Sequence, residues 1–120
     1  MIGIDIISIA RMQKFVEKFG TAALERFLCE KEIALCINAN ETINIPRVAG
    51  FWAAKEACSK ALGVGIGSKL SFLDMHISKS STNVPSIHLV SEKISDFNIK
   101  NIALSISHDG GFAIAVVVII

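Results

Sequence analysis

The sequence has little surplus charge and no long apolar run. Its 12 Lys and Arg residues are nearly balanced by 11 Asp and Glu residues, which leaves a formal net charge of +1. No global basic field therefore points to nucleic acid or to a membrane surface. No run approaches the roughly 20 apolar residues of a membrane-spanning helix. The N-terminal residues lack a basic segment and a small-residue cleavage site, so we expect no secretory signal peptide.

Cysteine is also scarce. Cys29, Cys36 and Cys58 are odd in number and show neither a Cys-x-x-Cys pair nor the spacing of zinc ligands. We expect three reduced thiols in a cytoplasmic protein, and a metal or redox role is the alternative.

Apolar residues, by contrast, make up 52% of the 120 residues, and charged residues make up 19%. This length corresponds to one domain, residues 1–120. A domain this small buries only roughly 60–70% of its unfolded surface. Some apolar sequence therefore stays exposed in a single copy, and exposed apolar patches mark interfaces. We expect a homo-oligomer, although composition alone leaves the number of subunits open.

The pattern of apolar residues predicts a single α+β domain without repeats or an internal linker. β-Branched or alternating runs predict strands at residues 1–9, 70–78, 86–90, 102–108 and 112–120. Helical spacing and capping residues predict helices at residues 11–19, 21–28, 30–37, 47–62 and 94–97. We expect the first strand to be buried. The last one, which ends AVVVII, must be covered to avoid an aggregation-prone edge.

The segment RVAGFWAAKEACSKALGVGIG, residues 47–67, is the most informative part of the chain. Residues three and four apart on a helix are neighbours, so Glu56, Ser59 and Lys60 are expected to face one way, followed by Gly63. A carboxylate, a hydroxyl and an ammonium together could hold a metal ion and a phosphate. The alternative is an ordinary exposed Glu–Lys pair worth about 0.3–0.5 kcal/mol. The apolar side of the same helix is predicted to carry Val48, Phe51, Trp52 and Leu62.

Asp5 is unusual because it interrupts an apolar strand, where an unpaired carboxylate has a large desolvation penalty. One interpretation is that side chains alternate and that Asp5 points to water together with Gly3. The other joins Asp5 with Glu56 as a two-carboxylate site for Mg²⁺, which is usually held by one or two carboxylates, waters and substrate phosphates.

Three further features have two interpretations each. The glycines of GVGIG follow a helix, unlike those of a P-loop, so Gly63 and Gly65 either stop the helix or bring backbone amides to an anion. Arg11, Lys14 and Lys18 recur at helical spacing and form either a solvated face or a docking strip for an acidic partner helix. His108, at the mouth of the C-terminal hairpin, is either a phosphate-facing donor or a turn residue.

Four segments together resemble the holo-(acyl-carrier-protein) synthases, the small bacterial group of 4′-phosphopantetheinyl transferases. They are GIDIISIARM, RFLCEKEI, AGFWAAKEACSKALGVGIG and LSISHDGGFAIAVVVI. They occur in the order and spacing of that family and together comprise 53 of the 120 residues. The resemblance implies transfer of 4′-phosphopantetheine from coenzyme A to a serine of apo acyl carrier protein in fatty acid biosynthesis. It also implies Mg²⁺ and a homotrimer with active sites at subunit interfaces.

The resemblance also assigns roles to individual residues. It makes Asp5 and Glu56 metal ligands, Glu56 and Lys60 the catalytic pair, and His108 a residue near the adenosine 3′-phosphate from a neighbouring subunit. Coenzyme A is expected to contact Asp5, Arg47, Ser59, Lys60, Gly63, Gly65 and His108. The carrier protein is expected to contact Arg11, and with it the rest of the basic strip, Lys14 and Lys18. The general base is Glu56 or a water that it orients.

Two positions depart from the family pattern. Phe51 stands where arginine is frequent, and Arg47 one turn earlier could supply the charge. Asp109 follows His108 where a small hydroxyl residue is common, so we expect its carboxylate to turn away from a phosphate. A non-catalytic module that binds coenzyme A or carrier protein, and a magnesium-dependent diphosphate hydrolase, are the alternative functions.

Overall fold

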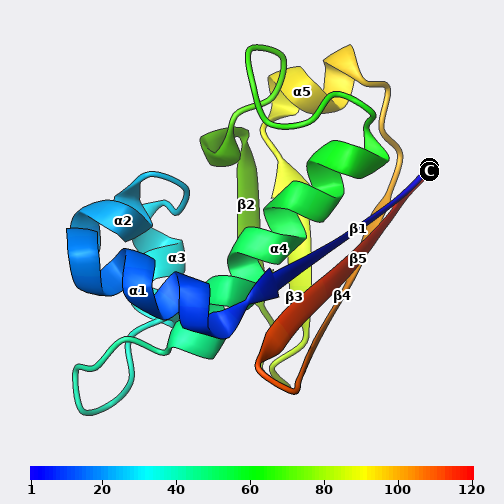
Figure 1. Ribbon diagram of the computed structural model, residues 1–120. Helices are drawn as coiled ribbons and strands as arrows, with labels where there is room; N and C mark the ends of the chain where they lie inside the picture. The colour runs from blue at the N-terminus through cyan, green and yellow to red at the C-terminus, as the bar shows by residue number, and fades with distance from the viewer.

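A 17-residue helix, α4 (Ile45–Ala61), runs through the middle of the molecule (Figure 1). The computed structural model describes all residues, 1–120. The Asn44 side chain caps α4 by accepting a hydrogen bond from the Arg47 amide at 3.1 Å, and Pro46 lies in the first turn, where no amide hydrogen is needed. The helix ends before Gly63, whose φ of 75° favours glycine. These local signals explain why the predicted helix forms with nearly the predicted ends.

Two antiparallel sheets flank α4. The three-stranded sheet has the order β1-β5-β4, and the two-stranded one is a β2–β3 hairpin. The strands are β1 (Ile2–Ser8), β2 (Met75–Lys79), β3 (Pro85–Leu89), β4 (Ile102–Asp109) and β5 (Phe112–Ile119). The remaining helices are α1 (Ile9–Phe19), α2 (Thr21–Glu25), α3 (Glu30–Leu35) and α5 (Ser91–Asp96). The prediction that the last strand is covered is confirmed, because β5 is central in its sheet.

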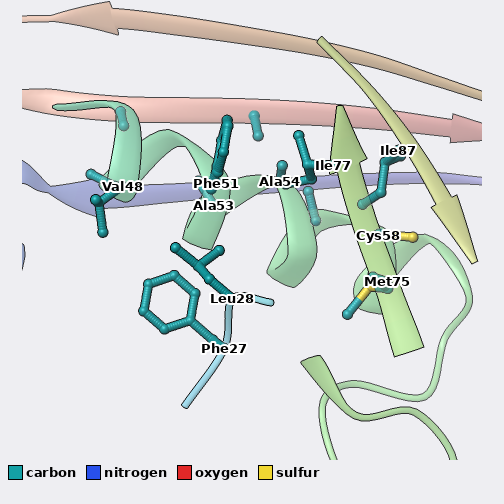
Figure 2. Close-up of a cluster of buried hydrophobic side chains, with 14 of the residues drawn as sticks. Phe27, Leu28, Val48, Phe51, Ala53, Ala54, Cys58, Met75, Ile77 and Ile87 are labelled. Atoms are coloured by element: carbon teal, nitrogen blue, oxygen red, sulfur yellow. The ribbon is translucent and has the colours of Figure 1, made fainter. Parts of the chain in front are cut away.

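The core surrounds α4 on nearly every side. Ala53, Ala54, Ala57 and Ala61 are buried, and these small side chains allow close approach of neighbouring elements. Figure 2 shows side chains of α4 packed between the sheet, the β2–β3 hairpin and the segment carrying Phe27 and Leu28. The prediction of a single apolar side was therefore too narrow, since this helix has almost no solvent-facing side.

The first strand differs from the prediction in which residues it buries. Ile2, Ile4 and Ile6 are 71%, 60% and 58% exposed, whereas Gly3 is buried. A Cβ at Gly3 would collide with the carbonyl oxygen of Ala57, so glycine lets β1 lie directly on α4. Asp5 shares that inner face by alternation. The prediction that the first strand is buried and the interpretation that Asp5 points to water are therefore both wrong for the isolated chain.

The predicted strand at residues 70–78 begins too early. Residues Phe72–Asp74 form a short 3₁₀ turn, η1, in which the Asp74 carboxylate accepts a hydrogen bond from the Ser71 amide at 2.9 Å. The strand β2 starts only at Met75. A local side-chain hydrogen bond therefore overrides the alternating pattern.

A buried ion pair joins α4 to α3 and to the segments that carry Phe27 and Phe72. The Lys55 ammonium donates to Glu32 at 2.9 Å and to the carbonyls of Phe27 at 2.6 Å and Phe72 at 3.1 Å. The Glu32 carboxylate also accepts hydrogen bonds from the amides of Cys29 and Ile77, both at 2.8 Å. Both side chains are buried, and every polar atom has a partner.

Candidate functional site

Asp5, Glu56 and Lys60 come together where β1 crosses the second half of α4. The Lys60 ammonium donates to Asp5 Oδ1 at 2.8 Å and to the Ile4 carbonyl at 3.2 Å, although Asp5 and Lys60 are 55 positions apart. The Asp5 side chain is 15% exposed and that of Lys60 is 51% exposed. Lys60 therefore pairs with Asp5 across two elements, and the interpretation as a simple Glu56–Lys60 helix pair is wrong.

Within this cluster, the Glu56 carboxylate has no hydrogen-bond or ion-pair partner in the chain. Its half-buried carboxylate takes part in none of the chain's side-chain hydrogen bonds or ion pairs. Burial raises the pKa of Glu56 and the nearby Asp5 carboxylate raises it further, while Lys60 partly opposes the shift. The hydrogen bond to Asp5 raises the pKa of Lys60. Two carboxylates that repel each other beside one ammonium form a site that a cation would stabilise.

The donors present suit Mg²⁺ only if other oxygens complete its shell. The chain has no group of three or more His, Cys, Asp and Glu side chains arranged to hold a metal ion. Asp5 and Glu56 would supply two carboxylates, and Mg²⁺ usually keeps waters and binds substrate phosphates in addition. The residues therefore fit a magnesium ion shared with a phosphate-bearing substrate.

Ser59 does not share the open side of Glu56 and Lys60. It is fully buried, and its hydroxyl donates to the Glu56 carbonyl at 2.7 Å. The expectation that the three side chains face one way is wrong for Ser59, because its hydroxyl bonds back to the backbone of its own helix. We therefore assign Ser59 no direct contact with a ligand.

The glycine-rich loop closes the end of α4. The Gly63 amide donates to the Lys60 carbonyl at 3.0 Å, and the amides of Val64 and Gly65 both donate to the Ser59 carbonyl at 3.3 Å. Gly63 and Gly65 have φ values of 75° and 66°. Their amides are occupied by the helix terminus, so this arrangement favours the helix-stop interpretation over a backbone anion site.

A second group of predicted residues lies at the opposite end of α4. His108 Nε2 donates to the Pro46 carbonyl at 2.8 Å, and Arg47 donates to the Leu35 carbonyl at 2.9 Å. They line a cavity of about 390 Å³ together with Asn44, Pro46, Gly50, Phe51, Lys79, Asn83, Pro85 and Ile106. A Cβ at Gly50 would lie only 3.1 Å from the His108 ring, so glycine makes room for the imidazole.

The two groups are separated along the helix. Thirteen residues from Arg47 to Lys60 correspond to about 20 Å at the rise of an α-helix. One chain therefore does not bring His108 and Arg47 next to Asp5, Glu56 and Lys60. A single site that uses both groups needs a long ligand, a second subunit or both.

The basic strip and the two departures have defined positions. Arg11, Lys14 and Lys18 are exposed on α1. Arg11 also lines an apolar cavity of about 180 Å³ with Ile7, Met12, Phe15 and Trp52. Phe51 is 1% exposed and packs in the core, while Asp109 is exposed outside the large cavity. The expectation that its carboxylate turns away from a phosphate stays a prediction.

Comparison with known proteins identifies the family. Residues 1–117 match the model of the 4′-phosphopantetheinyl transferase superfamily. The chain belongs to this superfamily. A holo-(acyl-carrier-protein) synthase of Helicobacter pylori (strain P12) is 59% identical over 119 residues, which cover 99% of this chain and 97% of that protein.

Solved structures of the superfamily share the whole fold. The crystal structure of Helicobacter pylori holo-(acyl-carrier-protein) synthase in complex with coenzyme A is 58% identical, with a TM-score of 0.92 over 99% of both chains. The synthase from Neisseria meningitidis is 30% identical, with a TM-score of 0.86 over 98% of this chain and 95% of that one. As in those transferases, helices pack on antiparallel sheet. None of the helices in the present chain has the length and apolarity needed to cross a membrane.

The structure also adds residues to those predicted. Lys79 and Asn83 line the large cavity, and Lys55 with Glu32 forms the buried pair beside the helix that carries Glu56. The adjacent lysine and glutamate at 55 and 56 were visible in the sequence, but helical spacing alone does not say which of the two is buried. Nothing in the strand pattern around Lys79 distinguishes it from a surface lysine.

Proposed function

We propose that this protein transfers the 4′-phosphopantetheine arm of coenzyme A to a serine of apo acyl carrier protein, in fatty acid biosynthesis. The observation that carries the proposal is the cluster of Asp5, Glu56 and Lys60 in a superfamily member 59% identical to a holo-(acyl-carrier-protein) synthase. The serine oxygen bonds to the phosphorus that carries the pantetheine arm. The bridging P–O bond breaks, and adenosine 3′,5′-bisphosphate leaves with the bridging oxygen.

Asp5 and Glu56 would hold Mg²⁺ in this reaction. When bound, the ion would supply charge neutralisation on the diphosphate. Lys60 acts on the same charge: its side chain is long and half exposed, and its ammonium can donate to phosphate oxygens as well as to Asp5.

The serine proton goes to Glu56 or to a water that Glu56 orients. Its half-buried carboxylate is free of hydrogen bonds, and its raised pKa brings it closer to the working pH than that of an ordinary glutamate. Both routes require the ionised carboxylate.

We propose further that the active enzyme is a homotrimer with shared sites. The outer face of the β1-β5-β4 sheet exposes a continuous apolar surface that a neighbouring copy would cover; it comprises Ile2, Ile4, Ile6, Phe112, Ile114, Val116 and Val118. Each site would combine Asp5, Glu56 and Lys60 of one subunit with Arg47 and His108 of the next. The separation of these groups along α4 supports this division.

The exposed strip of Arg11, Lys14 and Lys18 on α1 would bind the acidic helix of the carrier protein. The apolar cavity between Arg11 and Trp52 lies beside this strip and would accept an apolar side chain from the same helix. We place the protein in the cytoplasm, where its three free cysteines would stay reduced.

Intact-mass spectrometry of apo carrier protein after incubation with coenzyme A and Mg²⁺ tests the proposal. We expect the carrier to gain the mass of one phosphopantetheine arm. Nucleotide release without that gain would indicate a diphosphate hydrolase, and ligand binding without either would indicate a non-catalytic module.

Mixing two inactive variants tests the shared site. Glu56→Gln and His108→Ala, dissociated and reassembled together, should regain about one quarter of the wild-type activity if each site takes one group from each of two subunits. Native mass measurement should show three copies. A fully active monomer, or mixed variants that stay inactive although they form mixed trimers, would contradict the shared site.

A further inference from the structure

Two of the chain's three histidines stand opposite each other on the β2–β3 hairpin. His76 on β2 pairs with His88 on β3 in the antiparallel register. Directly opposed side chains on antiparallel strands share one face of the sheet, with their Cβ atoms about 4.5–5.5 Å apart. Both histidines are exposed, whereas their strand neighbours Met75, Ile77 and Leu89 are buried. The outer face of the hairpin therefore presents two neighbouring imidazoles to solvent.

The hydrogen bonds of both rings use the same nitrogen and leave the other one open. His76 Nε2 lies 3.2 Å from the Leu73 carbonyl oxygen. A carbonyl can only accept, so in this bond Nε2 carries the hydrogen and Nδ1 keeps its lone pair. His88 Nε2 lies 3.4 Å from the Ser86 hydroxyl, which also contacts the Ser78 hydroxyl at 3.0 Å. Neither Nδ1 atom takes part in a hydrogen bond of the chain.

Each ring thus has a partner on Nε2 of the kind that a metal-ligating histidine has. A histidine that binds a metal ion through one nitrogen usually donates its other N–H to a carbonyl, a carboxylate or a water, which fixes the tautomer and orients the ring. The Leu73 carbonyl does this for His76, and the Ser86 hydroxyl can accept from His88. Five consecutive residue pairs join β2 to β3 and fix the spacing of the two strands. The two ligands are therefore oriented by the fold.

We propose that His76 and His88 bind one divalent transition-metal ion of the Zn²⁺ type, through their Nδ1 atoms, on the outer face of the hairpin. Neutral imidazole is a preferred ligand of Zn²⁺, Cu²⁺ and Ni²⁺, with Zn–N distances of about 2.0–2.1 Å. The chain has no group of three or more His, Cys, Asp and Glu side chains that could hold an ion, so waters complete the coordination. The hairpin is a separate sheet from the one that carries Asp5 and the apolar surface assigned to subunit contact.

Titration calorimetry with Zn²⁺ tests this site, at constant pH and with excess Mg²⁺ present to occupy Asp5 and Glu56. The wild type is compared with His76→Ala, His88→Ala and His108→Ala, and the last is the matched control because it removes the chain's third histidine. Loss of an outer partner of a ligating histidine weakens metal binding about 10–100-fold. Loss of the ligand itself should therefore weaken Zn²⁺ binding at least about 10-fold in each hairpin variant. His108→Ala should bind Zn²⁺ as the wild type does.

Two further readouts identify the ligands and the bound state. The electron paramagnetic resonance spectrum of bound Cu²⁺ should show coupling to two imidazole nitrogens in the wild type and to fewer in either hairpin variant. Zn²⁺ should also raise the unfolding temperature of the wild type and of His108→Ala, but not of the double variant His76→Ala/His88→Ala, because an ion that binds only the folded state stabilises it.

Wild-type Zn²⁺ affinity in either hairpin variant, or equal weakening in His108→Ala, would overturn the inference. Failure of the wild type to bind Zn²⁺ would overturn it as well. Both hairpin histidines are exposed, so their substitution should leave the fold intact. Thermal unfolding of each variant without added Zn²⁺ checks this. The outcome is independent of the proposed function, since carrier-protein modification enters none of these measurements.

Discussion

Removal of the Lys55 ammonium tests how the helix that carries Glu56 is held. Lys55→Met keeps an unbranched side chain in the core but deletes the donor of three hydrogen bonds. The Phe27 and Phe72 carbonyls lose their side-chain donor. The Glu32 carboxylate keeps two amide donors but loses its counter-charge in a site that is 1% exposed.

We expect Lys55→Met to lower the free energy of unfolding by about 3–5 kcal/mol, the cost of an uncompensated buried charge. Burial lowers the pKa of Lys55, and the hydrogen bond and charge of Glu32 oppose this shift. Since small domains unfold with about 5–15 kcal/mol, this one substitution removes a large share of the stability. The double variant Lys55→Met/Glu32→Gln has no unpaired buried carboxylate. Its loss of unfolding free energy should therefore be smaller, by roughly 1–3 kcal/mol, than the sum of the losses in the two single variants.

Urea unfolding at fixed protein concentration measures these differences, because the stability of an oligomer depends on concentration. Lys93→Met is the matched control: its ion pair with Asp96 is 4.0 Å long and the aspartate is 56% exposed, so we expect a loss of about 0–1 kcal/mol. A loss below about 1 kcal/mol for Lys55→Met, or strict additivity in the double variant, would refute the assigned role of the pair.

Three further predictions concern the site and the core. Gly3→Ala should cost about 1–3 kcal/mol of stability by overpacking and lower activity by displacing Asp5, whereas Gly67→Ala, which has open space around it, should cost far less in thermal unfolding and turnover. Glu56→Gln should lower the rate at least roughly 100-fold, and full magnesium-dependent turnover in rate measurements across Mg²⁺ concentrations would contradict its assignment. Burial raises the pKa of Cys36 and Cys58 from 9.0 to about 12, so their contribution to stability is complete below pH 9 and is lost as the pH rises toward 12. Urea unfolding at pH 8 and pH 10 should therefore show a decline that is smaller in Cys58→Ala, and an unchanged decline would exclude burial as its cause.

The partnership of Asp5 with the central helix was predictable because an aspartate in an apolar strand needs a partner. Alternation also placed Gly3 and Asp5 on one face. Alternation did not say which face of β1 points inward, and the apolar isoleucines favoured burial of their own face. The structure resolves this through packing: only glycine fits against the Ala57 carbonyl, so Ile2, Ile4 and Ile6 must face outward. The pattern of the sequence gives no sign that those isoleucines are exposed on the outer face of the sheet.

The residues that sequence spacing misplaced share a physical cause. The last carbonyl groups of a helix lack partners within the helix and accept from nearby amides, and a serine hydroxyl can bond back to a carbonyl of its own helix. The Ser59 hydroxyl and the amides of Gly63 and Gly65 all bond to carbonyls of the last turns of α4. These donors are already used within the chain, so the proposed function assigns the phosphate contacts to the cations. Lys60 lies at one end of α4, and Arg47 with Lys79 lies at the other, about 20 Å away along the helix. Coenzyme A has charged groups at two separate places, a diphosphate and a 3′-phosphate. In the proposed trimer, cations at the two ends of α4 from adjacent subunits would meet both charges of the ligand.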